Sequence, residues 1–475
     1  MSARLTLLAT LASLVAPHSA LAIPPVQPAP AAQGAAADPA LASLERFGRS
    51  IERLTLENGL RLVLAPDSSA KTVALSVTYG VGSRDEGPGQ SGFAHLFEHM
   101  MFQGSKHVGK GQHFTLISER GGSLNGTTSA DRTNYYEVLP SSELALAMWL
   151  EADRMRALAV TAENFENQRA VVKEEYRMRY ENAPYMTGLI RLGELVFAEY
   201  GPYTRPTIGS MADLSAAKLE WVQAFYDQHY APKNAVVTVT GDFDRDQAVE
   251  LARYYFGSID KPTTPRAPLP DMPTSVTARK DVVHDANAKT PGFFFGYLIP
   301  KSGTPEHYAL ELAVALLADG ESSRLERLLV RDRAVAQRVT AWTRDYVGPD
   351  ELCVSAVLTE KAKLPEVQKL VEAELDKLAK QPAPAAELAK VKRRIRSAFV
   401  FGLQTNLTRA TRLGEYESYY GDARLLAREL ERYQAVTAEQ IQQAVKKYLS
   451  PERRQLVEVL PAEAPAAPAA AGGQP

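Results

Sequence analysis

The stretch Gly92-Phe93-Ala94-His95-Leu96-Phe97-Glu98-His99-Met100-Met101 is the starting point for predicting both the fold and the chemistry of this chain. It contains the order His-x-x-Glu-His within a run that we expect to be helical. Residues three and four apart share one face of a helix, so His95, Glu98 and His99 would point the same way. Two imidazoles at this spacing can bind one zinc ion, and a neighbouring carboxylate can take a proton from water that the metal activates. The competing interpretation is a solvated, charged face of a surface helix.

Length and composition limit the class of protein. The chain has 475 residues, which favours two to three domains. Its net charge of −2 argues against a nucleic-acid-binding protein and against a polybasic membrane anchor. Cys353 is the single cysteine, so an internal disulfide is impossible, and we interpret it as a buried thiol rather than a nucleophile.

Both ends of the chain differ from the middle in composition. Arg4 precedes the apolar run 5–15, and Ala20 and Ala22 follow it, which predicts a signal peptide over residues 1–22. The run is too short to span a bilayer, and no later segment is apolar enough to do so. We therefore expect export to a bacterial periplasm, with full secretion as the alternative. The Pro- and Ala-rich segments 23–42 and 461–475 are predicted to be a disordered tether and tail.

Alternating and helical patterns divide the first part of the chain. Asn58-Gly59 between two alternating runs predicts a hairpin. Further strands are predicted over 72–79, 124–139 and 235–240, and helices over 141–158, 162–180 and 214–229. Residues 261–274 carry too many prolines for regular structure, and we interpret them as a linker between domains.

The pattern begins again after the linker. Lys289-Thr290 opens a strand as Lys71-Thr72 does, and Ser450-Pro451 before a second strand resembles Ala231-Pro232. Two copies at a similar offset indicate a duplicated domain. The predicted fold is α+β, with homologous domains over 43–260 and 275–460, each a mostly antiparallel sheet with helices packed on one face.

The repeat also tests the metal motif. Aligning Gly104 with Gly320 places Glu311, Val314 and Ala315 opposite His95, Glu98 and His99. The second copy keeps an apolar helix there and has lost the ligand set. Because the fold does not need the histidines, the first copy carries them for another purpose.

A catalytic zinc site needs a third protein ligand and an open position for water. The predicted helix around Val171-Val172-Lys173-Glu174-Glu175 offers two carboxylates, and the pattern alone does not choose between them. His107 and His113 lie in a Gly- and Lys-rich stretch, where we interpret them as solvated loop residues.

Several stretches together carry a family resemblance: Gly121–Thr128, Asp131–Tyr135, Asp153–Met155 and Pro206–Ser210. With the His-x-x-Glu-His motif, they make the chain similar to the pitrilysin family of zinc metallopeptidases. In that family a distal Glu follows in a Val-Val-x-x-Glu context, and this spacing selects Glu175 over Glu174. Gln168 is a departure, since some relatives carry a second acidic residue there.

The resemblance implies a site and a reaction. One Zn²⁺ per chain would be held by His95, His99 and Glu175, with Glu98 as the general base. The strand around Asn125 and Gly126 resembles the family's substrate-binding edge. The expected activity is endopeptidase cleavage of short or unfolded polypeptides.

The resemblance also implies an alternative, non-enzymatic function and a partner chain. Some family members are non-enzymatic assembly subunits, which typically lose the ligands that this chain retains. Family members of this length pair with a second chain, so we expect either a homodimer or a heterodimer with a zinc-free paralogue. In some pairs the partner supplies Arg and Tyr side chains to substrate. Here 409–420 is a candidate region only, and a charged helix surface is the simpler interpretation.

Overall fold

The computed structural model describes residues 39–462. The predicted signal peptide, most of the tether and nearly all of the tail lie outside these residues. The first half consists of α1 (Pro39–Ser50), β1 (Glu52–Thr55), β2 (Arg61–Pro66), β3 (Thr72–Tyr79), α2 (Phe93–Met100), α3 (Gln112–Ser118), β4 (Ser123–Thr128), β5 (Thr133–Pro140), α4 (Leu144–Arg156), α5 (Ala162–Tyr176), α6 (Met186–Val196), α7 (Met211–Ala216), α8 (Leu219–His229), β6 (Ala235–Gly241) and α9 (Arg245–Phe256).

The second half repeats this plan, although its described residues include no counterpart of β1. Its elements are β7 (Arg279–Asp285), β8 (Gly292–Ile299), α10 (Pro305–Ala318), β9 (Ala336–Thr343), β10 (Asp350–Leu358), α11 (Leu364–Lys380), α12 (Ala385–Gly402), α13 (Asn406–Tyr420), α14 (Glu429–Ala435), α15 (Ala438–Tyr448) and β11 (Gln455–Pro461). Between Phe256 and Arg279, a stretch that includes the predicted linker 261–274, the chain forms no helix or strand.

Apart from β1, the two sheets have the same strand order. The first runs β1-β2-β6-β3-β5-β4 and the second β7-β11-β8-β10-β9. In each sheet one pair is parallel, β2 with β6 and β7 with β11, while the other neighbours are antiparallel. The α+β class and the mostly antiparallel duplicated sheet are thus confirmed.

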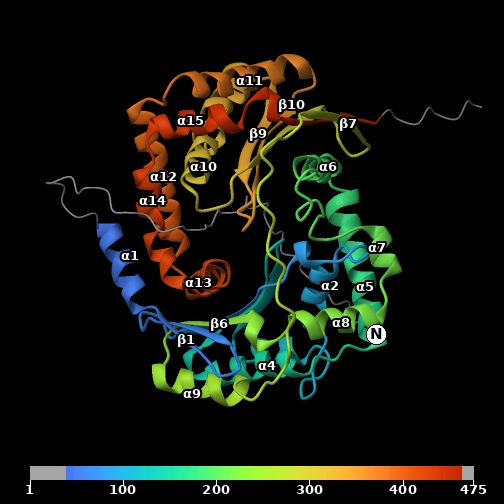
Figure 1. The fold of residues 1–475 in the computed structure, drawn as a ribbon, viewed down its shortest axis with the longest axis vertical. Coiled ribbons are helices and arrows are strands. Elements are labelled where there is room, and N and C mark those ends of the chain that lie inside the picture. Colours follow the sequence, from blue (N-terminus) through green and yellow to red (C-terminus); the bar gives the residue numbers. More distant parts are fainter. Residues whose placement is uncertain (1–38, 463–475) are drawn as a thin grey trace, which may run out of the picture.

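A helix from each half covers the sheet of the other half. In Figure 1, α13 lies on the face of the first sheet opposite to α4 and α9. Likewise, α6 packs against β8 and β11 of the second sheet, where Leu192 and Val196 join Val457 and Val459 in one cluster. The helices predicted on one face of each sheet are therefore complemented by an exchanged helix on the other face.

Glycines allow the exchanged helices to approach closely. A Cβ atom at Gly188 of α6 would lie 2.3 Å from Val459 Cγ2, and one at Gly414 of α13 would lie 2.6 Å from Thr78 Oγ1. Real side chains do not tolerate such distances without movement of their neighbours. The close packing of both helices thus depends on a missing side chain at each position.

Two predicted boundaries differ from the structure. Helix α1 begins at Pro39, four residues before the predicted start of the first domain at Ser43. Its apolar side chains, including Leu44, pack into the core of the second half, which a composition rich in Ala and Pro did not reveal. The continuous strand predicted over 124–139 is instead a hairpin, because residues 129–132 form a turn in which the Ser129 N–H donates to the Arg132 carbonyl oxygen at 2.8 Å.

Within the described residues, no helix combines the length and apolar character that crossing a membrane requires.

Candidate metal centre

Helix α2 starts at a position that only glycine fills easily. Gly92 has φ of +98°, and a Cβ atom there would lie 2.6 Å from the Ile208 carbonyl oxygen. The carboxylate of Glu86 accepts hydrogen bonds from the N–H groups of Gly92 and Ala94 at 3.0 and 2.9 Å. These contacts satisfy two donors at the helix N-terminus and set the direction in which the motif residues point.

Three ligand atoms converge between α2 and α5. His95 Nε2 lies 3.7 Å and His99 Nε2 lies 3.2 Å from Glu175 Oε2. One ligand atom from each of the three residues falls within 4.8 Å of the others. Ligands of a tetrahedral zinc ion with bonds of 2.0–2.1 Å stand about 3.4 Å apart. The donor set and its spacing therefore fit a zinc ion.

The structure distinguishes Glu174 from Glu175 as the candidate third ligand, a choice that the sequence pattern alone did not make. Glu174 pairs with Arg177 at 2.9 Å and its side chain is largely exposed. Glu175 faces the histidines, and its second oxygen lies 3.1 Å from Arg179 Nη1. Partners of this kind orient metal ligands. The sequence analysis did not identify Arg179. Its position four residues after Glu175 could have predicted the contact, because residues four apart on a helix are neighbours.

Burial tunes the protonation of the ligands. It lowers the pKa of His95 to about 4, and the neighbouring His99 acts in the same direction while Glu175 opposes it. Burial also acts to raise the pKa of Glu175, but the hydrogen bond to His99 and the nearby His95 and Arg179 side chains hold it below its usual value. At neutral pH, His95 is thus a neutral imidazole and Glu175 a carboxylate, which are the forms that bind metal.

Glu98 lies under strand β4. Its Oε2 accepts a hydrogen bond from Thr128 Oγ1 at 2.5 Å. Burial raises the pKa of Glu98, while the Thr128 hydroxyl and His99 oppose the shift. A carboxyl group with a raised pKa is suited to both accepting and returning a proton near neutral pH.

Strand β4 is the outermost strand of the first sheet, so one of its backbone edges is unpaired within the described fold. Asn125 is exposed on this strand, and its Oδ1 accepts from the Gly126 N–H at 2.8 Å. Gly126 is buried against Glu98. The two residues predicted to bind substrate therefore lie on an outer strand edge beside the three ligands.

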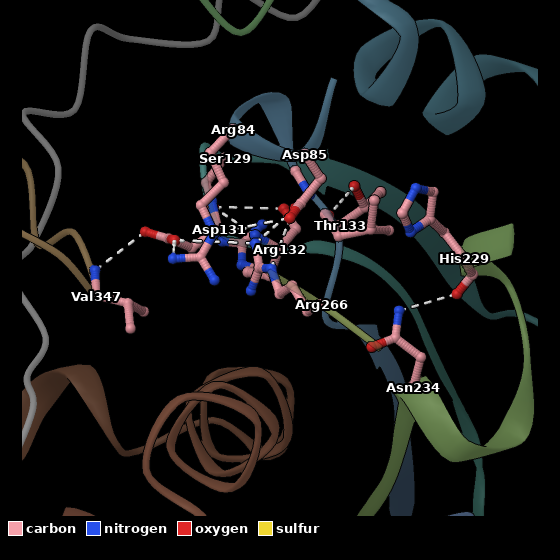
Figure 2. Close-up of polar contacts among 12 residues, drawn as sticks. Arg84, Asp85, Ser129, Asp131, Arg132, Thr133, His229, Asn234, Arg266 and Val347 are labelled. Atoms are coloured by element: carbon pink, nitrogen blue, oxygen red, sulfur yellow. Dashed lines mark hydrogen bonds and ion pairs between the residues drawn. The ribbon is translucent and has the colours of Figure 1, made fainter. Parts of the chain in front are cut away.

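The turn after β4 is held by charges from distant parts of the chain. Figure 2 shows Asp131 between Arg84 and Arg266, with the Val347 N–H of the second half donating to its carboxylate. Arg266 of the predicted linker also binds Asp85 through two hydrogen bonds of 2.7 and 2.6 Å. No sequence pattern predicts this cluster, because its members are far apart in the chain.

Arg132 of the same turn links β4 to the second half. Its guanidinium donates to the Thr127 carbonyl oxygen at 3.0 Å and pairs with Glu415 of α13 at 2.8 Å. The hydroxyls of Ser129 and Tyr419 lie 3.5 Å apart. The simpler interpretation of residues 409–420 as a charged helix surface is therefore wrong. Helix α13 packs between the first sheet and the rest of the second half.

With this geometry, the chain can be compared with known proteins. Residues 61–188 match the family model described as Insulinase (Peptidase family M16), and residues 217–395 match the Peptidase M16 inactive domain. Over 77% of its length the chain is 30% identical to Zinc protease PqqE of Helicobacter pylori, and the match covers 83% of that protein. The chain belongs to peptidase family M16.

Solved structures agree with this M16 assignment. A crystal structure of a protease from Helicobacter pylori has a TM-score of 0.82 at 28% identity, covering 86% of this chain and 99% of the other. The periplasmic protease PqqL of Escherichia coli has the same fold at 20% identity and a TM-score of 0.70. The match covers 88% of this chain and 49% of PqqL.

Among the described residues, the other histidines of the first half of this M16 chain, His107, His113 and His229, do not join the three ligands. His113 is not a solvated loop residue as predicted; it lies on α3, is buried, and its Nε2 is 3.3 Å from Glu137 Oε1. His107 pairs with Asp153 at 2.6 Å. The prediction for His113 was wrong because the glycines before it form turns, after which the apolar side of a short helix faces the core.

Proposed function

We propose that this M16 chain is a zinc-dependent endopeptidase with one Zn²⁺ held by His95, His99 and Glu175. The observation that carries the proposal is the convergence of these three ligand atoms within 4.8 Å, next to the partly buried carboxylate of Glu98 and the outer edge of a sheet. The set has the two imidazoles and one carboxylate of a three-ligand catalytic zinc site.

The proposed mechanism divides the work between the metal and the protein. His95, His99 and Glu175 would hold the zinc, which would supply a Lewis acid for the scissile carbonyl and lower the pKa of water so that it can lose a proton near neutral pH. Glu98 accepts the proton of the attacking water and then delivers it to the leaving amine. Its partial burial against β4 reduces its exposure to water, which strengthens the electrostatic interactions in the site.

We propose that substrate binds as an added strand along β4. Backbone groups near Asn125 and Gly126 would pair with an extended peptide, which is a common mode of peptide recognition. This pairing requires an extended chain and reads few side chains, so short or unfolded polypeptides of varied sequence are the expected substrates.

We further propose that the chain is exported and works with a second chain of the same fold. Its N-terminal composition favours a cleavable signal, and its structural neighbour PqqL is described as a periplasmic protease. This chain corresponds to about half the length of PqqL, 49% by coverage. A homodimer or a heterodimer with a zinc-free paralogue would cover the β4 edge. Sizing of the purified protein, alone and with a co-expressed paralogue, tests this pairing.

The deciding experiment combines metal analysis with peptide cleavage. Wild-type protein should contain one zinc per chain and should cleave an unstructured fluorogenic peptide. Glu98→Gln should keep the zinc and lose turnover by about 10²–10⁴-fold, the usual contribution of a general acid–base group. Zinc-free wild type, or equal cleavage by both proteins, would contradict the proposal. A zinc-free, inactive wild type would instead favour the non-enzymatic assembly subunit.

A further inference from the structure

The hydroxyl of Thr128 makes a short contact with the proposed general base. Thr128 Oγ1 donates to Glu98 Oε2 at 2.5 Å, the distance typical of a hydroxyl bound to an ionised carboxylate. The contact occupies Oε2 and leaves the position of Oε1 for the proton of the attacking water. One oxygen of the carboxylate is thus used for orientation and the other for chemistry.

Gly126 brings the same strand against the stem of Glu98. Side chains alternate along a strand, so positions 126 and 128 lie on the face of β4 that looks toward α2. A Cβ atom at Gly126 would lie 3.0 Å from Glu98 Cγ, closer than nearly all real Cβ contacts, so a side chain there would press on Glu98. Glu98 is therefore confined at its methylene by the Gly126 backbone and at its carboxylate by Thr128.

We propose that Thr128 is a positioning residue for catalysis, which ties the orientation of Glu98 to the strand that binds substrate. The inference rests on the proposed function, because it assigns Thr128 a role through Glu98. A glutamate side chain has several rotatable bonds, and a misplacement of a catalytic group by about 1 Å can cost a large factor in rate. The hydroxyl selects one orientation before substrate arrives. Because β4 carries both Thr128 and the peptide-binding edge, this one strand positions the general base relative to the bound peptide.

The anchoring of β4 supports this role. The strand ends at Thr128, and the next residues form the turn held by Arg132 and Asp131. The hydroxyl of the neighbouring Thr127 has other partners. It accepts a hydrogen bond from the Arg132 guanidinium at 2.6 Å and donates one to Asn134 Oδ1 at 2.5 Å. Neighbouring threonines on β4 thus have different partners, and Thr128 is the one directed at the base.

The test compares three substitutions in the full-length protein. Thr128→Val removes the hydroxyl with little change in volume, and Thr128→Ser restores it. Thr133→Val is the matched control, because Thr133 pairs with Thr128 across the β4–β5 hairpin and its hydroxyl donates to the Val81 carbonyl oxygen at 2.9 Å. For each protein, kcat and KM for an unstructured peptide, zinc content, zinc affinity by chelator competition and thermal midpoint are measured.

Thr128→Val should lower kcat by about 10- to 100-fold, which corresponds to a lost hydrogen bond to a charged group. KM, zinc content and zinc affinity should stay at wild-type values, and Thr128→Ser should recover most of kcat. Thr133→Val should keep kcat. The inference is overturned if Thr128→Val raises KM with kcat unchanged, if it releases zinc, or if serine fails to restore kcat.

A double substitution separates this inference from the proposed function. In a Glu98→Gln background, Thr128→Val should cause no further loss, because the two groups act as one unit. If Glu98→Gln itself leaves turnover unchanged, the proposed function fails. If Glu98→Gln is inactive while Thr128→Val is fully active, the proposed function stands and the positioning role is overturned.

Discussion

Helices α2 and α10 follow equivalent strands in the two halves, yet their side chains do different work. The first carries His95, Glu98 and His99, while the alignment of the repeat puts Glu311, Val314 and Ala315 at these positions in the second. Glu311 accepts a hydrogen bond from Tyr433 at 2.8 Å, and Ala315 packs in the core. The comparison teaches that this helix is needed by the fold for packing, and that the ligand set in the first half is an addition to that packing.

The largest expected effect comes from removing ligands in the first half alone. His95→Ala, His99→Ala or Glu175→Gln should each abolish tight zinc binding and peptide cleavage, since each removes one of three protein ligands. Zinc content by mass spectrometry and cleavage rates check this. Glu174→Gln is the matched control and should keep both, because its carboxylate pairs with Arg177. Loss of zinc from Glu174→Gln with retention in Glu175→Gln would reverse the assignment.

The next effect concerns how the second half supports the site. Glu415→Gln removes the carboxylate that neutralises Arg132 of the turn after β4. The free energy of unfolding should fall by about 1.5–3 kcal/mol, the range for hydrogen bonds to charged groups. Urea denaturation measures this, and zinc content should not change. An unaltered free energy would mean that the halves are coupled without this pair.

Replacing the glycine at the contact of either exchanged helix should lower stability by a similar amount. Gly188→Ala and Gly414→Ala each place a methyl group within 2.6 Å of a neighbouring atom. Overpacking costs about 1–3 kcal/mol, and the better helix propensity of alanine returns about 0.5–1 kcal/mol of it. The net loss, about 1 kcal/mol by the same figures, is measurable by urea denaturation. Gly402→Ala is the control, because a Cβ atom there would meet nothing within 4 Å, and it should not destabilise the protein.

The last effect is a pH dependence of stability, and it comes from a buried acid near α10. Burial raises the pKa of Glu429 to about 8, while the Tyr416 hydroxyl bond opposes the shift. A carboxyl group with a raised folded-state pKa contributes stability that is fully present below its unfolded-state pKa, about 4.3, and is lost progressively as pH rises from there through about 8. Glu429→Gln stays neutral, so it should match wild type at about pH 4 and gain on wild type as pH rises from there to about 8. Thermal midpoints across this range check the sign, and parallel curves would contradict it.

The sequence predicts best where one local pattern controls the outcome. The predicted strand 72–79 has the bounds of β3, because its β-rich run ends in glycines. The α+β class and the duplication follow from similar patterns repeated after the linker. The spacing of His95, Glu98 and His99 likewise follows from the geometry of a single helix.

Other features depend on contacts between distant residues. The pattern of α13 shows that it has an apolar side, but not that this side covers β3 and β6 of the other half. The contact between Thr128 and Glu98 requires β4 to lie across α2, and the spacing of 30 residues contains no hint of it. The choice of Glu175 over Glu174 depends on family resemblance, because neighbouring carboxylates on one helix differ only in direction.

The exchanged helices α6 and α13 also determine what would happen if the chain were cut. Cutting the Pro-rich segment 261–274 would remove the covalent connection between the halves. The sheet of each piece would still be covered by a helix of the other piece. The nicked protein should therefore co-migrate as one particle and melt in one transition. Produced separately, each piece would expose the apolar sheet face that its missing helix normally covers, as on β3 and β8, whose residues are almost all buried in the intact chain. Solubility would then require both pieces to be made together, as in the complementation of split proteins.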